Sequence, residues 1–449
     1  MDSALQVACL LFIGACCAGI GIGVHSSIFR LLHVRNAMTA KLMYSGEWLY
    51  AFFSHTSIAL AFTLVAFLAV WCEFTASGSG IPEVKALLNG VNLRAAFRVR
   101  TLAVKATSVI FAVSSGLFVG PDGPMIHMCA IVGVIISKFF DSLKFEKSLA
   151  RNSSICDFAT FGAAAAIAAS FRAPFGGVLF AVEEAASRWS ARVVSRAFLC
   201  AAVTYLIVVV VDKLRIRNAT DSEEISSNFS FGHFSQSYAG HMDYQMLELV
   251  LFMLVGIAGG VLGAVFIMIV SMFTAWFTFT LPIIWSVCTT VPDSADTYLS
   301  NDERILMMFH LREHMAVQTF SVDTLLIVFF PYFVFAMYTV GVTASVGAFI
   351  PLLMSGALMG RIIGAGLIIV FPDTVADSGT YALVGAAAML GGACRSVAAI
   401  TVILMETTGN LQFALPLMIS LVTARIVGDS ISDGLYISIC AAREYICLP

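Results

Sequence analysis

A lone aspartate between glycines and prolines, set in a long apolar part of the chain, most constrains how this sequence can fold. The stretch Gly116–Cys129 reads GLFVGPDGPMIHMC, with Asp122 at its centre. Its glycines permit unusual backbone angles, and Pro124 suits the first turn of a helix that we expect to continue through residues 125–137. Helix N-termini attract anions, so a carboxylate placed there competes with a bound anion unless it is protonated.

The composition indicates a membrane protein. Of the 449 residues, 59% are hydrophobic and 12% are charged, whereas soluble proteins carry about 25% charged residues. Residues 4–24 and 49–71 are long enough to cross a bilayer, and the first segment lacks a basic n-region and a cleavage site, so we expect it to be retained. The 11 cysteines lack metal-binding spacing and are interpreted as packing residues. We therefore expect an all-α, multi-pass integral membrane protein, not an enzyme, without metal, cofactor or nucleic-acid partner.

Several apolar segments have the wrong length for a simple span. Only 14 residues separate Asp157 from Arg172, and only eight separate Pro174 from Glu183. Conversely, residues 249–281 form a run of 33 residues without a charge, which must be tilted or broken. Such segments are typical of transporters whose discontinuous helices meet near the midplane of the membrane.

Charged residues predict the orientation of the chain. Basic residues gather in two short connections, which the positive-inside tendency places in the cytosol. The connection 217–243 is acidic and carries glycosylation sequons at Asn218 and Asn228, so we place it on the luminal or extracellular side. A sequon at Asn152 falls in a basic connection, and we expect it to be unused. The basic residues are Lys85, Arg94, Arg98, Arg100 and Lys105 in one connection and Lys144, Lys147 and Arg151 in the other.

Two halves of the chain resemble each other. GAAAAIAASFRAPFGGVLFAVEE from Gly162 aligns with GAAAMLGGACRSVAAITVILMET from Gly385, 223 residues later. The alignment matches Arg172 with Arg395 and Glu183 with Glu406, which we interpret as structural ion pairing. Residues 120–124 and 347–351 share a G-x-x-x-P frame. We expect one transmembrane domain, residues 1–449, with a first repeat at about 1–212, a luminal connection at about 213–245 and a second repeat at about 246–440.

Three Gly/Pro-framed turns begin helices in apolar surroundings. They are Gly78–Glu83, the Asp122 turn and Gly347–Pro351. In lipid, the free N–H groups of such turns must be satisfied by protein, water or a ligand. Each turn alone is equally consistent with a helix kink. Together they favour a site at the repeat interface that holds an anion weakly enough to release it, with the Ser79 hydroxyl as a further donor.

Two carboxylates are the candidate proton carriers. Asp122 lies at the second turn, and Glu184 ends a short helix. Ionisable groups in membrane segments usually have a function. Burial and a nearby bound anion both favour the protonated form, so both side chains could exchange protons reversibly near neutrality. We interpret His127, a lone histidine on a helix of small residues, as a packing residue.

These motifs together resemble those of the CLC family of chloride channels and transporters. GSGIPE at 78–83, GPDGP at 120–124 and GAFIP at 347–351 are similar to its three signature turns, and Tyr436 in DGLY matches its late tyrosine. GLFVG…GPMIH and YALVGAAAMLGG are most similar to the endosomal and lysosomal branch of eukaryotic members.

The resemblance implies a two-repeat fold with many tilted and discontinuous helices, and a homodimer with one pathway per subunit. It implies that the hydroxyls of Ser79 and Tyr436 bind the central chloride, and that serine at position 79 favours chloride over nitrate. Asp122 holds the place of the gating glutamate, and Glu184 that of the internal proton-transfer glutamate. The backbone N–H groups implied in anion binding are those of Ala348 and Phe349, with Gly78, Gly80, Ile81 and Gly123 as further candidates in the turns.

The second turn departs from the family pattern G-K/R-E-G-P. Pro121 replaces the basic residue and removes a backbone donor, which should weaken anion attraction at the outer mouth. Asp122 is shorter than glutamate by roughly 1.5 Å, which should loosen proton coupling. Eukaryotic members also carry a long cytosolic N-terminus and two nucleotide-sensing domains. We expect no cytosolic regulatory domain in this chain, and a first fold element that is missing or reduced.

The leading hypothesis is a proton-coupled chloride antiporter, because both carboxyl positions are filled. A passive chloride channel and a non-transporting subunit remain as alternatives, owing to Pro121 and Asp122. The expected location is an endosomal, lysosomal or other vesicle membrane, with the plasma membrane as an alternative. Whether an accessory subunit binds is left open.

Overall fold

The computed structural model describes residues 3–91, 93, 95–142, 152–185, 190–218, 248–277, 322–340, 344–370 and 377–442. Within these ranges the chain is helical and contains no β-strand, so the predicted all-α class is confirmed. Six helices of the described part are long and apolar enough to cross a membrane. Arg94, the basic residues Lys144, Lys147 and Arg151, and the sequon residue Asn228 lie outside the described residues.

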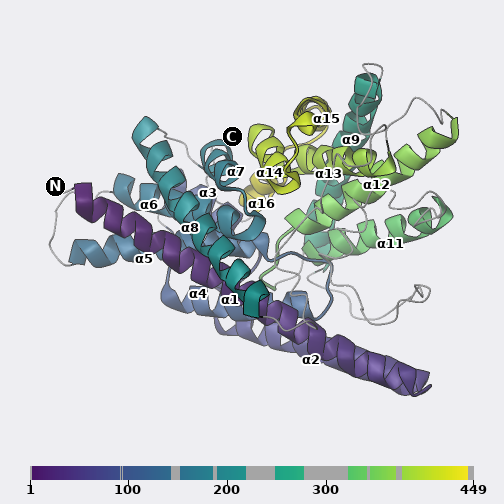
Figure 1. Ribbon diagram of the computed structural model, residues 1–449, viewed down its shortest axis with the longest axis horizontal. Helices are drawn as coiled ribbons and strands as arrows, with labels where there is room; N and C mark the ends of the chain where they lie inside the picture. Colours follow the sequence, from purple (N-terminus) through teal and green to yellow (C-terminus); the bar gives the residue numbers. More distant parts are fainter. Residues whose placement is uncertain are drawn as a thin grey trace.

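The helices follow the two halves of the chain (Figure 1). The first half contains α1 (Ser3–Tyr44), α2 (Trp48–Cys72), α3 (Ile81–Leu88), α4 (Val99–Ser114), α5 (Asp122–Ser142), α6 (Asn152–Phe171), α7 (Pro174–Phe180), the short helix η2 (Ala181–Ala185) and α8 (Ala191–Asn218). The second half contains α9 (Glu248–Phe277), α11 (Val322–Val340), α12 (Phe349–Val370), α13 (Ser378–Cys394), α14 (Ala398–Thr408), α15 (Ala414–Asp429) and α16 (Leu435–Ala442). The first span is longer than predicted, because residues 25–44 contain no glycine or proline to end α1.

Glycines let equivalent helix pairs approach closely in both halves. A Cβ atom on Gly133 of α5 would overlap the carbonyl of Phe158 in α6. Correspondingly, a Cβ atom on Gly360 of α12 would overlap the carbonyl of Tyr381 in α13. Small residues at helix interfaces in membranes permit such backbone contact. The same packing at repeat-equivalent positions supports the two-repeat fold.

Equivalent elements of the two halves run antiparallel. Gly120 and Gly347, which match in the repeat, form an antiparallel bridge with N···O distances of 3.1 and 2.9 Å. Helices α7 and α14 also run in opposite directions, since a carboxylate near the end of each binds the start of the other. A two-fold axis that relates antiparallel elements is perpendicular to them, so the repeats are inverted with respect to each other.

The reciprocal capping of α7 and α14 is made by the two matched glutamates. Glu183 accepts hydrogen bonds from the N–H groups of Val397 (2.8 Å), Ala398 (3.3 Å) and Ala399 (2.8 Å) and from the Ser396 hydroxyl (2.9 Å). In the opposite direction, Glu406 accepts from the N–H groups of Phe175 (3.1 Å) and Gly176 (2.7 Å). A carboxylate at a helix N-terminus is favoured by the helix dipole and by charge-assisted hydrogen bonds.

The matched arginines have partners other than the matched glutamates. Arg172 pairs with Asp212 at 2.7 Å, and Arg395 pairs with Asp429 at 3.2 Å. Both arginines adopt left-handed backbone angles, with φ of 55° and 64°, where the chain breaks between two helices. The structural ion pairing predicted for the matched residues is found for both arginines and for Glu183, which lies 4.0 Å from Arg425. The two glutamates also cap helices, which the sequence did not predict.

Candidate functional site

Three Gly-framed turns meet at the interface between the two halves. The Gly78 N–H donates to the Ala344 carbonyl at 3.1 Å, which joins the first turn to the segment before the third. The Gly120–Gly347 bridge joins the second turn to the third. A Cβ atom on Gly123 would lie 2.9 Å from the Ser79 Cβ and 3.3 Å from the Gly347 Cα. The structure thus brings together the three turns that the sequence predicted to act as one site.

Each turn delivers a helix N-terminus to this point. Gly80, with φ of 81°, is the N-cap of α3, and Ile81 is its first residue. Helix α5 begins at Asp122, and α12 begins at Phe349, directly after Ala348. The first N–H groups of an α-helix have no acceptor within the helix, so these ends can receive an anion.

Asp122 is buried at the tip of α5. Only 3% of the surface of this residue is exposed. One carboxylate oxygen lies 3.0 Å from the position that a Cβ atom on Gly120 would occupy. The carboxylate therefore lies beside its own turn, and glycine at position 120 leaves room for it.

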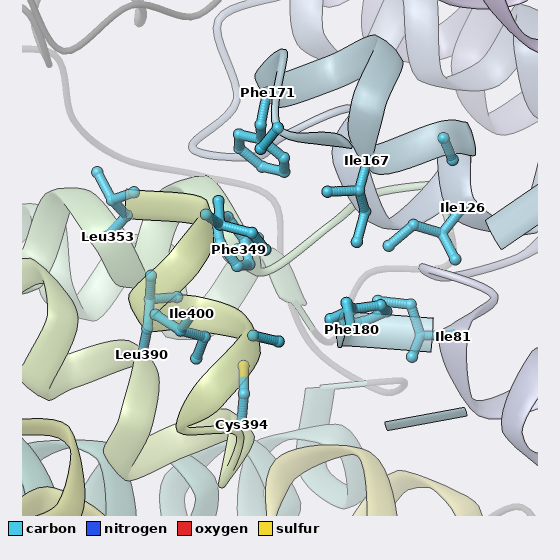
Figure 2. Close-up of a cluster of buried hydrophobic side chains, with 14 of the residues drawn as sticks. Ile81, Ile126, Ile167, Phe171, Phe180, Phe349, Leu353, Leu390, Cys394 and Ile400 are labelled. Atoms are coloured by element: carbon cyan, nitrogen blue, oxygen red, sulfur yellow. The ribbon is translucent and has the colours of Figure 1, made fainter. Parts of the chain in front are cut away.

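Apolar side chains surround the meeting point of the helices. Phe349 at the start of α12 packs on Phe171 at the end of α6, with ring centroids 4.8 Å apart. Figure 2 shows Ile81 beside Phe180 and places Cys394 in the same cluster. Such a lining excludes bulk water from the turns, which strengthens their electrostatic interactions with an ion.

Tyr436 enters the site from α16. It is 3% exposed, and its hydroxyl lies 4.0 Å from the Cys394 sulfur, which is within hydrogen-bonding range for a thiol. The Cys440 thiol, one turn along α16, donates to the Pro82 carbonyl of α3 at 3.8 Å. Helix α16 is thereby held against α3, the helix that follows Ser79.

Glu184 lies at the end of α7, in η2, outside the six candidate spans. Its Oε2 atom is 3.6 Å from Lys85 Nζ, and the two side chains are 7% and 14% exposed. Burial raises the pKa of Glu184 to about 7, and the Lys85 ammonium opposes this rise. A carboxyl group with such a pKa can gain and lose protons at physiological pH.

A cavity of about 130 Å³ joins Glu184 to Tyr436. A water occupies roughly 10–15 Å³ of such volume, so several waters fit. Glu184 and Tyr436 therefore border one space large enough for water. The lining residues are Lys85, Glu183, Glu184, Cys394, Arg395, Arg425, Gly434, Tyr436 and Ile437.

Two basic residues that the sequence placed in a cytosolic connection lie inside the molecule. Lys85 is part of α3 and pairs with Glu184, and Lys105 is part of α4 and is 0% exposed. Lys105 Nζ lies 3.0 Å from Nδ1 of His127, whose ring packs against Gly80. The prediction for Lys105 was wrong, because charge clustering does not reveal a lysine inside a helix. The apolar run on both sides of Lys105 was the available signal.

A search among the described residues finds no group of histidine, cysteine and carboxylate side chains that could hold a metal ion. The nine cysteines of the described part are free, and most are buried. The candidate site therefore consists of helix ends, hydroxyls and two carboxyl groups.

Comparison with known proteins places the chain beside ion transporters. A family model described as voltage gated chloride channel matches residues 59–429. The H(+)/Cl(-) exchange transporter 7 of Mus musculus is 34% identical over 422 residues, which cover 84% of this chain and 52% of the transporter. This chain spans about half the length of the curated relatives it matches.

Two solved structures have a similar fold. A eukaryotic CLC transporter superimposes with a TM-score of 0.74 at 22% identity, covering 98% of this chain and 74% of that one. A slow cyanobacterial Cl-/H+ antiporter superimposes with a TM-score of 0.78 at 19% identity, covering 98% of this chain and 97% of that one.

Proposed function

The chain belongs to the voltage-gated chloride channel family, and we propose that it is a proton-coupled chloride antiporter. The resemblance predicted from the motifs is confirmed by the family match. The single observation that carries the proposal is the cavity that both the acid Glu184 and Tyr436 line. A relative at 34% identity is named as a proton/chloride exchanger, which supports the same activity here.

The chloride ion binds where the three turns meet. The hydroxyls of Ser79 and Tyr436 donate to the ion, and the N–H groups of Ala348 and Phe349 complete its shell. The positive ends of α3, α5 and α12 attract the ion without a formal charge, which keeps the binding weak enough for release. The backbone of the turns approaches the ion closely at Gly78, Gly80, Ile81 and Gly123.

The proton uses two acids in sequence. Asp122 occupies an anion position when it is ionised and leaves that position when it is protonated, so proton and chloride compete at the tip of α5. Glu184 receives protons from the cytosolic side and passes them through the cavity toward Asp122. Because each carboxyl group must titrate for the cycle to proceed, chloride movement and proton movement are coupled.

A passive chloride channel is the second candidate. The observation that favours it is the position of the Asp122 carboxylate, which lies beside Gly120 in its own turn. An aspartate that does not reach the central anion would leave the pathway open. The third candidate, a non-transporting subunit, is motivated by Pro121 in place of the basic residue.

The protein acts in a bilayer as a homodimer with one pathway per subunit, and we place it in endosomal, lysosomal or related vesicle membranes. Asn218, at the end of α8, lies at the luminal end of that helix in this topology. No cofactor is required, because the substrates are chloride and protons.

Flux through reconstituted liposomes tests the proposal. With an imposed chloride gradient and a potassium clamp, an antiporter moves protons against their own gradient, which a pH electrode records. Chloride flux without proton movement would contradict exchange and favour the channel. The absence of both fluxes, in protein that is folded and monodisperse, would favour the non-transporting subunit.

A further inference from the structure

Arg35 is a buried arginine of α1, and it lies against the connection between α4 and α5. Only 8% of its surface is exposed. Its Nη1 atom donates to the Ser114 carbonyl at 2.9 Å, and a Cβ atom on Gly116 would lie 2.7 Å from the same nitrogen. Glycine at position 116, with φ of 89°, therefore leaves the space that the guanidinium occupies. A charge inside a membrane segment is costly, and it usually serves a function.

The place of Arg35 along α1 puts it toward the luminal side. Figure 1 shows α8 beside α1, and two hydrogen bonds show that these helices run in the same direction. Near the start of both helices, Arg196 donates to Gln6 at 2.6 Å, and further along both, Arg215 donates to Ser26 at 2.8 Å. In the proposed topology α8 ends at the luminal side. The part of α1 beyond Ser26, which contains Arg35, therefore lies toward the lumen.

The connection that Arg35 contacts leads directly to Asp122. Helix α4 ends at Ser114 and α5 begins at Asp122, and residues 115–121 between them include no charged side chain. Asp122 is six residues beyond Gly116, so it is at most about 22 Å away, the length of a fully extended chain. Inside a protein, a unit charge still acts on an ion over this distance.

The guanidinium places positive charge on the negative end of α4. Ser114 is the last residue of this helix, whose final carbonyl groups repel an anion that approaches from the lumen. The guanidinium donates to neutral oxygens, those of the Ser114 carbonyl and, at 3.4 Å, of the Asn36 amide. Hydrogen bonds to neutral oxygens do not cancel its charge. Arg35 therefore reverses the sign of the potential at this helix end.

Two further cations of α1 lie beyond Ser26, but both are exposed. They are Arg30 and Lys41. Salt largely screens exposed charges beyond about 8–10 Å, whereas it screens a buried charge much less. Arg35 therefore contributes more than these two neighbours to the potential at the Asp122 turn.

We propose that Arg35 strengthens chloride binding at the three turns, through a positive charge that acts from the luminal end of α4. Arg35 does not touch the ion, so it is a positioning residue for the anion rather than a ligand. This deepens the proposed function, on which it rests for the identity of the bound ion. An arginine that only capped α4 would contribute to stability and leave chloride affinity unaltered.

Chloride binding to the purified full chain in detergent, measured by isothermal titration calorimetry, tests the proposal. The measurement is made in an Asp122→Ala background, which removes the carboxylate that competes with the ion. Arg35→Gln keeps an N–H donor for the Ser114 carbonyl but removes the charge, so chloride affinity should fall about threefold to fivefold. Arg35→Lys keeps the charge and should retain the affinity of the background.

Two further variants separate the charge from the cap. Adding Pro121→Arg to Arg35→Gln returns a positive charge to the same connection, next to position 122, and should restore the affinity. A loss caused by damage to the end of α4 would persist in this double variant. Arg30→Gln is the matched control, because Arg30 is an exposed arginine of the same helix and should behave like the background.

Unchanged chloride affinity in Arg35→Gln would overturn the proposal. So would a loss that folded, monodisperse double variant does not recover, an equal loss in Arg35→Lys, or an equal loss in Arg30→Gln. The liposome flux measurement succeeds or fails separately. Absence of coupled flux with this affinity pattern intact would contradict antiport alone, and coupled flux without the pattern would contradict the role of Arg35 alone.

Discussion

At the scale of single residues, Asp122 is the side chain that we propose links proton movement to chloride movement. It stands at the first position of α5 and is buried among the three turns. In the proposed mechanism, an ionised carboxylate there occupies the place of an anion, and a protonated one vacates it. The shorter side chain and the neighbouring Pro121 make this the position where the chain departs most from its relatives' pattern.

Replacing Asp122 tests its role as the gate. Asp122→Ala should abolish proton coupling and leave chloride permeation, because the competing carboxylate is gone. Asp122→Glu should tighten the coupling, because the longer side chain reaches the central anion. The proton-to-chloride ratio in liposomes measures both. Proton pumping by Asp122→Ala would show that the gate lies elsewhere, and an unchanged ratio in Asp122→Glu would show that aspartate already reaches far enough.

Glu184 predicts how exchange depends on cytosolic pH. Burial raises the pKa of this acid to about 7 and Lys85 opposes the rise, so the group is mostly protonated below pH 7 and mostly ionised above it. Proton supply should therefore decline by about tenfold per pH unit well above 7. Initial proton fluxes between pH 6 and 8.5 measure the profile. Glu184→Gln should lose proton flux at every pH and retain chloride flux, and a wild-type profile in this variant would contradict the assignment.

Motifs predicted the site residues whose function depends on local backbone geometry. Ser79, Asp122 and Phe349 were found because glycines and prolines fix the turns that contain them. Lys105 was misplaced, because its partner His127 comes from another helix, and no sequence signal showed that Lys85 pairs with Glu184. Local sequence carries no record of a contact between distant segments.

At the scale of helices, two carboxylates join α7 to α14. Glu183, after α7, binds the start of α14, and Glu406 of α14 binds the start of α7. Each helix is too short to be stable without tertiary contacts, since isolated helices need roughly 12–15 residues. The two carboxylates accept hydrogen bonds from backbone N–H groups at the N-termini of both helices. This capping also holds the chain at Glu183, the residue directly before Glu184, so the contact helps to position this acid.

Removing the two capping carboxylates should lower the free energy of unfolding by different amounts. Glu183 accepts four hydrogen bonds and Glu406 accepts two. We expect Glu183→Ala to cost roughly 1–3 kcal/mol, and more than Glu406→Ala, because more donors lose their acceptor. Thermal unfolding in detergent, followed by size-exclusion chromatography, compares the two variants. Equal melting temperatures in wild type and Glu183→Ala would contradict the capping role.

For the matched glutamates, the sequence predicted a structural role but not the contact through which each one acts. The repeat alignment paired Glu183 with Glu406 and indicated a structural role. It could not show that each glutamate lies at the end of a helix antiparallel to its equivalent, because direction in the membrane is a property of the whole fold.

The whole molecule is built from two inverted halves whose interface contains the anion turns and the cavity. The antiparallel Gly120–Gly347 bridge lies at this interface. Figure 1 shows the first half, purple to teal, and the second half, green to yellow, meeting near α7, α14 and α16. In transporters built from two repeats, the substrate site lies at such an interface.

The central claim is that one pathway couples chloride to protons, and a reversed gradient tests it most directly. Liposomes containing the wild-type chain are given equal chloride on both sides, a potassium clamp at zero voltage and a pH gradient, and accumulation of radioactive chloride is measured. We expect chloride to accumulate above equilibrium, and this accumulation to disappear with a proton ionophore and to be absent in Asp122→Ala. Chloride that only equilibrates in the wild type, whatever the pH gradient, would contradict the central claim.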